Sequence, residues 1–313
     1  MARKNNKRGL LVVITGPTAS GKTSLAVQLA QHLHTEIISA DSRQFYREIP
    51  IGTAAPTVEE MQGITHHFVG NLSINDAYNA SKFEEEVLLL LQEKFKTQPF
   101  MVMVGGSGLY LDAVCKGIDL LPDPDPEIRQ RVQNRFENEG ISGLSQWLQE
   151  LDPDYFAVVD TNNPMRMMRG IEVCLQTGHP YSKQRLNTSK PRVFKIVKIG
   201  LELPRVVLVE RIHQRTDFML DAGWLEEARG VYPHRHLNAL NTVGYKELFA
   251  YLSGECSLEK AVEKIKTNTR RYAKRQMTWL RRDAEMHWVD GRNSDLALQT
   301  IINLIESMNN SKA

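Results

Sequence analysis

The 313-residue chain contains few cysteines and no long apolar run. The three cysteines, Cys115, Cys174 and Cys256, are far apart and odd in number, which favours neither a metal site nor a disulfide framework. No apolar run approaches the roughly 20 residues of a membrane-spanning helix. Internal repeats and low-complexity tracts are also absent. We therefore expect a folded protein with no membrane segment, in the reducing environment of the cytoplasm.

An excess of one charge is also lacking, because 39 Lys and Arg residues face 37 Asp and Glu residues. The net charge of +2 therefore favours no class of partner. The basic segment 1–8 precedes an apolar run that is too short for a secretion signal, and we interpret it as a frayed tail. The length allows one large domain or two modest ones.

One stretch matches the phosphate-binding pattern of Gly, four residues, and Gly-Lys-Ser/Thr: Gly16-Pro17-Thr18-Ala19-Ser20-Gly21-Lys22-Thr23. Residues 11–14 before it predict a buried strand, and residues 23–34 after it predict an amphipathic helix. In this context backbone N–H groups converge on an anion at a helix N-terminus. Lys22 then reaches a phosphate oxygen and Thr23 holds Mg²⁺. The loop alone does not tell whose phosphates bind.

Two further predicted strands end close to this loop. Segment 36–41 ends in Asp41, and strand 100–104 is followed by Gly105-Gly106-Ser107. Residues just past the strand ends of an open α/β sheet line the ligand crevice, so we expect Asp41 and Ser107 there. Asp41 is alternatively a helix N-cap, and the glycine turn is alternatively a plain turn. Glycines and Ser107 stand at the end of strand 100–104, where many nucleotide hydrolases carry an Asp for Mg²⁺.

The composition changes at residues 121–126, where three prolines exclude a helix and a central strand. We interpret this segment as the hinge into an inserted, mostly helical unit, residues 119–190. The unit interrupts an α/β core made of residues 1–118 and 191–313. Its predicted helices are 127–139, 143–150 and 164–176.

Arginines are placed for anion binding in the second part of the core. Arg211 and Arg215 share one face of predicted helix 205–221. They either clamp an anion at the phosphate site or pair with Glu210 and Asp217, and the sequence leaves both interpretations open.

Segment 267–282 carries six basic residues and no acid. Four of them stack in pairs at helical spacing: Arg270 with Lys274 and Arg271 with Arg275. Basic residues with interleaved aromatics are typical of a surface that contacts a nucleic-acid backbone. The alternative is an amphipathic helix in which Tyr272, Gln276 and Trp279 face the core.

Taken in chain order, these stretches resemble the tRNA dimethylallyltransferase family. The resemblance rests on the phosphate-binding loop and on residues 41–44, 51–54, 104–110, 169–173, 243–245 and 269–279. It implies a P-loop NTPase-like α/β core with a parallel sheet and an inserted helical unit. It also implies transfer of a dimethylallyl group from dimethylallyl diphosphate to N6 of the adenosine 3′ to the anticodon, position 37, with Mg²⁺. The implied partners are the donor and the anticodon stem-loop of tRNA, and a monomer is expected.

The resemblance assigns roles to individual residues. The diphosphate binds the loop Gly16–Thr23, Thr23 holds the metal, and Asp41 is the general base. Ser107 keeps the hydroxyl of a Thr that is frequent in bacterial members. Met165, Asn241 and Thr242 differ from the residues common in the family. The positions implied to contact tRNA, with those of the basic segment, are Asp41, Ser42, Arg43, Gln44, Ser107, Arg129, Met165, Arg166, Met167, Met168, Arg169, Asn241, Thr242, Val243, Gly244, Tyr245, Lys246, Arg270, Arg271, Lys274 and Arg275.

The chemistry of these residues agrees with the implied reaction. An exocyclic adenine amine is a poor nucleophile, and a carboxylate such as Asp41 can take its proton as the C–N bond forms. Charge on the leaving diphosphate is stabilised by backbone amides, Lys22, Mg²⁺, Arg211 and Arg215.

Three alternatives share parts of the pattern. A nucleoside or metabolite kinase shares the loop and the acid, but the 105–107 turn and the basic segment count against it. An adenylate isopentenyltransferase acting on a free nucleotide needs no inserted unit. A non-catalytic RNA-binding protein with a decayed loop conflicts with the intact Lys22, Thr23 and Asp41.

Overall fold

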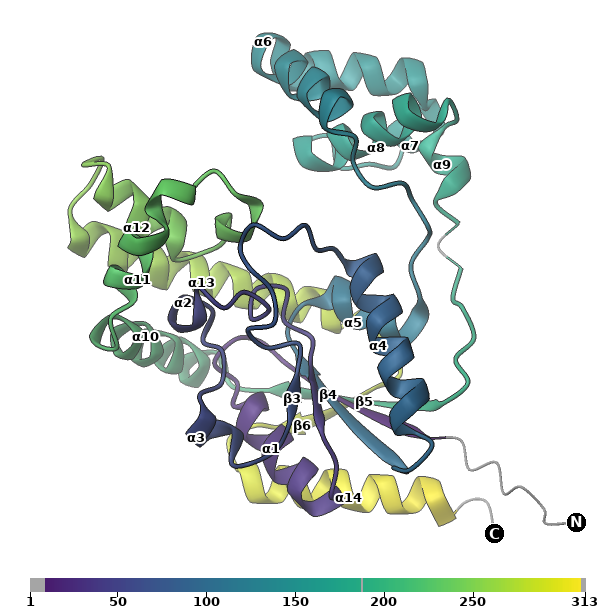
Figure 1. Ribbon diagram of the computed structural model, residues 1–313, viewed down its shortest axis with the longest axis vertical. Coiled ribbons are helices and arrows are strands. Elements are labelled where there is room, and N and C mark those ends of the chain that lie inside the picture. Colours follow the sequence, from purple (N-terminus) through teal and green to yellow (C-terminus); the bar gives the residue numbers. More distant parts are fainter. Residues whose placement is uncertain (1–8, 187, 311–313) are drawn as a thin grey trace, which may run out of the picture. The chain divides into compact units, whose positions relative to one another are not determined.

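The computed structural model describes residues 9–186 and 188–310 (Figure 1). The predicted frayed tail, residues 1–8, lies outside the described residues. The chain divides into two compact units, which we describe separately: unit 1 is Met1–Cys115 with Arg192–Ala313, and unit 2 is Lys116–Pro191. The predicted insertion, residues 119–190, falls within unit 2. No helix in the described part of the chain is long and apolar enough to cross a membrane.

Unit 1 is built around one parallel sheet of six strands in the order β3-β2-β4-β1-β5-β6. The strands are β1 (Leu10–Thr15), β2 (Ile37–Ser39), β3 (His66–His67), β4 (Phe100–Gly105), β5 (Lys195–Glu202) and β6 (Met286–Asp290). All residues of β1 are buried between β4 and β5, as its β-branched run predicts. Polar and apolar residues alternate at the start of strand β5. All residues of Val197–Leu201 are nevertheless buried, because both faces of the sheet are covered.

Helices cover each face of this sheet with a separate core. On one face α1 (Lys22–Leu33) and α14 (Ser294–Asn310) pack on alternate residues of β1. On the other face lie α4 (Ala80–Lys94), α5 (Gly108–Lys116) and the end of α13 (Leu258–Leu280) (Figure 1). The phosphate-binding loop therefore leaves the centre of the sheet, between the two helical layers.

A third core in unit 1 joins a helical segment to the loops after β2. The helical segment comprises α10 (Arg205–Asp221), α11 (Trp224–Val231), η1 (Tyr232–His234), η2 (Asn238–Leu240) and α12 (Tyr245–Leu252), together with α13. Gly223, at φ +99°, separates α10 from α11. Tyr46 and Ile49 from the chain after β2 are buried among these helices, next to α2 (Pro50–Thr53). The short helix α3 (Val58–Met61) follows, with a capping box at Thr57.

Unit 2 has its own core and is helical, as its sequence predicts. It consists of α6 (Pro126–Leu151), α7 (Pro153–Phe156), α8 (Pro164–Thr177) and α9 (Tyr181–Gln184). The two predicted helices 127–139 and 143–150 are parts of α6, which is interrupted at Gly140 with φ +65°. Leu144 and Trp147 of α6 pack against Met167 and Ile171 of α8.

Candidate functional site

The phosphate-binding loop joins β1 to α1 and is shaped to receive an anion. Gly21, at φ +88°, is the N-cap of α1 and supplies no side-chain cap. The first N–H groups of the helix therefore remain for a ligand. Pro17 accepts a hydrogen bond from Lys22 Nζ at 3.3 Å, which holds the ammonium along the loop. The buried Oγ of Ser20 has no hydrogen-bond partner among the described residues.

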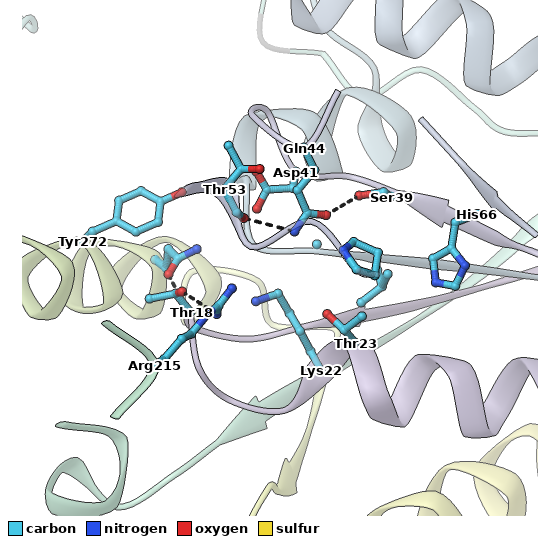
Figure 2. Close-up of a pocket in the computed structure, with 14 residues that line it drawn as sticks. Thr18, Lys22, Thr23, Ser39, Asp41, Gln44, Thr53, His66, Arg215 and Tyr272 are labelled. Carbon is cyan, nitrogen blue, oxygen red and sulfur yellow. Dashed lines mark hydrogen bonds between the residues drawn. The ribbon is translucent and has the colours of Figure 1, made fainter. Parts of the chain in front are cut away.

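Lys22 and Asp41 line the same cavity of about 50 Å³, together with Thr18, Thr23 and Arg215 (Figure 2). Burial, and then the charge of Arg215, lowers the pKa of Lys22 from 10.5 to about 8, and Asp41 opposes this shift. Burial removes water from the ammonium and so destabilises its charged form. A bound anion stabilises that charged form again through its opposite charge. The cavity is thus electrostatically prepared for a polyanion.

Asp41 is followed by a turn and not by a helix, so the alternative of a helix N-cap is wrong. Its Oδ1 accepts the backbone N–H of Arg43 at 3.0 Å, which is a local turn contact. The side chain also lines the cavity with Lys22. Ser107 lies beside it, because its Oγ accepts the N–H of Ser42 at 3.0 Å and donates to Ser42 Oγ at 3.2 Å. The two strand ends therefore meet, as predicted from the parallel sheet.

The arginines of α10 point to the loop. Arg215 Nη1 donates to Thr18 Oγ1 at 3.2 Å, and Arg211 Nη1 donates to the carbonyl of Ser20 at 3.4 Å. The acids that offered an alternative pairing are engaged elsewhere: Asp217 pairs with Lys266 at 2.6 Å, and Glu210 accepts from Gln214 at 3.2 Å. Arg215 lines both cavities and Arg211 lines neither, so the geometry favours anion binding by Arg215, with Arg211 held on the loop backbone.

Helix α13 presents two faces, which separates the two interpretations of its sequence. Arg270, Arg271, Lys274 and Arg275 are exposed. Gln276 is buried, accepts the N–H of Thr18 and donates to the carbonyl of Gly106, both at 2.9 Å. Trp279 Nε1 donates to Asp112 at 2.9 Å. Tyr272 and Trp279 are half-buried between the two faces, with Arg275 over the Tyr272 ring at 5.7 Å and Arg282 over the Trp279 ring at 5.9 Å. The inward face supports the loop.

Tyr272 belongs to that inward face and was not predicted as a site residue. It lines the cavity with Asp41, and its ring points from α13 toward Asp41 and Thr53 in Figure 2. Burial, and then the charge of Asp41, raises the pKa of Tyr272 to about 12, with a hydrogen bond to Ser107 opposing. Its hydroxyl thus stays protonated at neutral pH. The spacing of Tyr272 and Gln276, four residues apart, was the only signal in the sequence.

A second cavity, of about 110 Å³, adjoins the first. The two share Thr18, Asp41, Thr53, Arg215 and Tyr272. The remainder of the second cavity is more apolar, with Ile212, Met219, Trp224 and Val243 in its lining. A polyanion site and a partly apolar site thus meet at one carboxylate.

Comparisons with known proteins identify the family. The sequence model described as IPP transferase matches residues 44–283. The chain belongs to this family. A tRNA dimethylallyltransferase 2 of Parabacteroides distasonis is 54% identical over 278 residues, which is 89% of this chain and 93% of the relative.

Two solved structures show the IPP transferase fold. The tRNA isopentenylpyrophosphate transferase of Bacillus halodurans gives a TM-score of 0.71 at 35% identity and covers 96% of both chains. A eukaryotic dimethylallyltransferase crystallised acting on tRNA gives 0.79 at 25% identity, over 97% of this chain and 80% of that one. These likenesses confirm the predicted fold class and the family resemblance, and they count against the kinase alternative.

Several positions that the resemblance assigned to tRNA contact are buried. Met167 and Met168 lie in the core of unit 2, and Tyr245 is fully buried in the third core of unit 1. Gly244 is also buried, and its N–H donates to Glu247 at 2.7 Å. Side chains in a core cannot contact a polynucleotide, so we correct the assignments of Met167, Met168 and Tyr245.

Other assigned positions remain accessible in the IPP transferase. Met165, Arg166, Asn241 and Lys246 are exposed, whereas Thr242 and Val243 line the second cavity.

The predicted tRNA-contacting residues after β2 have structural partners. Arg43 Nη1 donates to the carbonyl of Asn238 at 2.8 Å. Gln44 lines the first cavity while its side chain accepts from Ser39 at 3.0 Å and donates to the carbonyl of Ala54 at 2.9 Å.

Arg129 and Arg169 of unit 2 converge on a buried carboxylate. Arg129 Nε lies 3.3 Å from Glu172 Oε1, and Arg169 Nη1 lies 3.5 Å from Glu172 Oε2. Arg169 also donates to the carbonyl of Pro122 at 2.6 Å. Glu172 is only 2% exposed, so the two arginines compensate the charge of this buried acid. The side chain of Arg129 is half exposed and therefore also reaches the surface of the unit.

The donor set of the cavity suits a metal that is held largely by its substrate. Thr23 offers a hydroxyl and Asp41 a carboxylate in one cavity. The described residues contain no cluster of three or more His, Cys, Asp or Glu side chains that could hold a metal ion. Mg²⁺ is commonly bound by one or two protein oxygens together with phosphate oxygens and water, so the residues fit this ion.

Proposed function

We propose that this protein moves a dimethylallyl group from dimethylallyl diphosphate to N6 of the adenosine at position 37 of tRNA. The observation that carries the proposal is the joint lining of one cavity by Lys22, Arg215 and Asp41. Two cations at a phosphate-binding loop suit a departing diphosphate. A carboxylate where this cavity meets a more apolar one suits a base acting on the acceptor amine.

The reaction forms a bond between adenine N6 and the allylic carbon and breaks the bond from that carbon to the diphosphate oxygen. Asp41 takes the proton that N6 loses, and the diphosphate leaves with its electron pair. Lys22, Arg215 and the N–H groups at the start of α1 hold the increasing negative charge. Thr23 would hold Mg²⁺, which would neutralise part of that charge.

Asp41 is the group of this site that takes the proton from N6. Tyr272, whose hydroxyl stays protonated, and the ammonium of Lys22 both lie within electrostatic reach of it.

The exposed basic face of α13 supports tRNA as the acceptor, as do the exposed residues of unit 2. A surface of Arg270, Arg271, Lys274 and Arg275 contacts phosphates without reading sequence. We place the reaction in the cytoplasm, where tRNA is available.

The test is to incubate the protein with unmodified tRNA, Mg²⁺ and either dimethylallyl diphosphate or ATP. The tRNA is then digested, and the masses of its nucleosides are measured by mass spectrometry. The proposal predicts an adenosine heavier by one dimethylallyl group with the first donor only. Phosphate transfer from ATP contradicts it in favour of a kinase. Modification of free AMP but not of tRNA contradicts it in favour of an adenylate isopentenyltransferase.

A further inference from the structure

The turn that walls both cavities is held by a side chain from a distant helix. Residues 50–54 form α2 and its C-terminal end, and Thr53 lines both cavities while Gly52 and Ala54 line the second. Glu227, on α11, accepts the N–H of Ile51 on Oε2 and of Gly52 on Oε1, both at 2.8 Å. One carboxylate thus binds two successive amides of the wall.

The same carboxylate is anchored from behind. The hydroxyl of Tyr245, on α12, donates to Glu227 Oε1. Burial, and then the charge of Glu227, raises the pKa of Tyr245, so this hydroxyl stays a donor. Tyr245 is 0% exposed and packs edge-on against Trp224, which leaves it no other position. Glu227 therefore cannot swing away from the turn without breaking a buried contact.

The turn needs such a hold. Ala54 has φ +47°, a left-handed conformation that is unfavourable for a residue with a Cβ. Conformations of this kind persist only where the surroundings enforce them. Gly52 is pressed against the helices so closely that a Cβ there would lie 2.1 Å from Trp224 Nε1 and 2.3 Å from Tyr245 Oη. On the other side, Gln44 Nε2 donates to the carbonyl of Ala54 at 2.9 Å.

We propose that Glu227 is a positioning residue for prenyl transfer, which fixes the 50–54 turn and thereby sets the size of the prenyl group accepted next to Asp41. The inference rests on the proposed function and deepens it. Glu227 lines neither cavity, so it acts through the backbone of Ile51 and Gly52. Without it, the wall relaxes toward solvent and the space at Asp41 widens.

The test compares Glu227→Gln with the wild-type protein. The glutamine side chain has nearly the same volume as glutamate. Its NH₂ group, however, faces a backbone N–H that needs an acceptor. Single-turnover transfer from dimethylallyl diphosphate to tRNA should fall on the order of 10²-fold, the effect of misplacing reacting groups by about 1 Å. The ratio of dimethylallyl to geranyl transfer should fall about tenfold, because a wider pocket discriminates less against a longer chain.

The ratio separates positioning from loss of folded protein, since a smaller active fraction lowers both rates equally. Glu48→Gln is the matched control: Glu48 similarly accepts from Ser73 Oγ at 2.7 Å and from the N–H of Ile74 at 3.0 Å, in a loop outside both cavities. Its ratio should equal that of the wild type. Tyr245→Phe removes one bond to Glu227, keeps the ring, and should shift the ratio in the same direction by less.

An unchanged ratio in both Glu227→Gln and Tyr245→Phe overturns the inference, even where the rates fall. If Glu227→Gln does not fold, Tyr245→Phe alone decides by the same criterion. A wild-type protein that transfers no dimethylallyl group to tRNA contradicts the proposed function, and the inference then falls with it. If the wild type is active and substitution of Glu227 leaves the ratio unchanged, the inference alone is contradicted and the proposed function stands.

Discussion

At the scale of single residues, the site combines charges that would be unfavourable without a ligand. Lys22 and Arg215 face one cavity in which Asp41 is the single acid among the described lining residues, and burial lowers the pKa of both cations. Each cation is therefore better stabilised when a diphosphate is present. The two cations therefore stabilise the transition state more than the bound donor, because the negative charge on the diphosphate increases as its bond to the allylic carbon breaks.

The pKa of Lys22 predicts how donor binding depends on pH. In the free protein the ammonium loses its proton as the pH rises through about 8. A bound diphosphate favours the charged form, so binding above this pH takes up a proton and the affinity falls with rising pH. Calorimetric titration with dimethylallyl diphosphate from pH 7 to 10 should show a decline that begins near 8.

Lys22→Met provides the control for this titration. It should bind the donor more weakly at pH 7 and lose the decline attributable to the ammonium. A wild-type affinity that stays level from pH 7 to 10 would show that Lys22 does not contact the diphosphate.

At the scale of elements, local sequence patterns predicted what local physics determines. The β1–loop–α1 unit follows from a β-branched run, glycines at fixed positions and a helical stripe, all within residues 10–33. The meeting of Ser107 with Ser42, the neighbour of Asp41, followed from the parallel sheet, since both segments lie just past strand ends.

The remaining part of the site depends on packing between distant segments, which no local pattern carries. The hold of Glu227 on residues 51 and 52 spans more than 170 positions of the chain, and its partners lie on α2 and α12. Met167, Met168 and Tyr245 were assigned to tRNA because a resemblance transfers positions and not exposure. The inward turn of Tyr272 and Gln276 was visible only as one of two possible faces of α13.

The two faces of α13 predict separable effects on tRNA binding. Changing both Arg271 and Arg275 to Gln removes charge from the exposed face without touching Gln276. Each lost phosphate contact should flatten the plot of log affinity against log salt by roughly 0.7 to 0.9. Filter binding or fluorescence anisotropy measures this slope. The salt concentration is varied over roughly 50 to 300 mM, which brackets physiological ionic strength.

The donor provides the internal control for that double variant. Dimethylallyl diphosphate should bind as in the wild type, because the loop is supported by the opposite face of the helix. Arg292→Gln, an exposed arginine paired with Asp290, should leave the slope unchanged. An unaltered slope in the double variant would contradict a role of α13 in tRNA binding.

At the scale of the whole molecule, the chain keeps the cavities and the insertion in separate folding units. Unit 2 has its own core around Trp147 and Ile171, and within it the N–H of Lys190 donates to the carbonyl of Lys116 at 2.6 Å. The chain thus enters and leaves the unit at one place. Such an insertion can add a binding surface without altering the catalytic core.

Hydrogen exchange tests whether unit 2 contributes to tRNA binding. Adding tRNA should slow amide exchange in α6 and α8, where Arg129 and Arg166 lie on the surface. Dimethylallyl diphosphate alone should slow exchange at the loop of unit 1 and leave unit 2 unaffected. Unchanged exchange in α6 and α8 at saturating tRNA would exclude the unit from the interface.

The division of labour between Asp41 and Lys22 is the central claim, and one paired measurement tests it most directly. It is single-turnover dimethylallyl transfer by Asp41→Asn and Lys22→Ala, with separate titrations of donor and tRNA. Asp41→Asn should slow transfer by about 10²- to 10⁴-fold, the usual contribution of a positioned base, while both ligands bind nearly as in the wild type. Lys22→Ala should weaken donor binding and transfer together. Near wild-type transfer by Asp41→Asn, or normal donor binding by Lys22→Ala, would contradict the account.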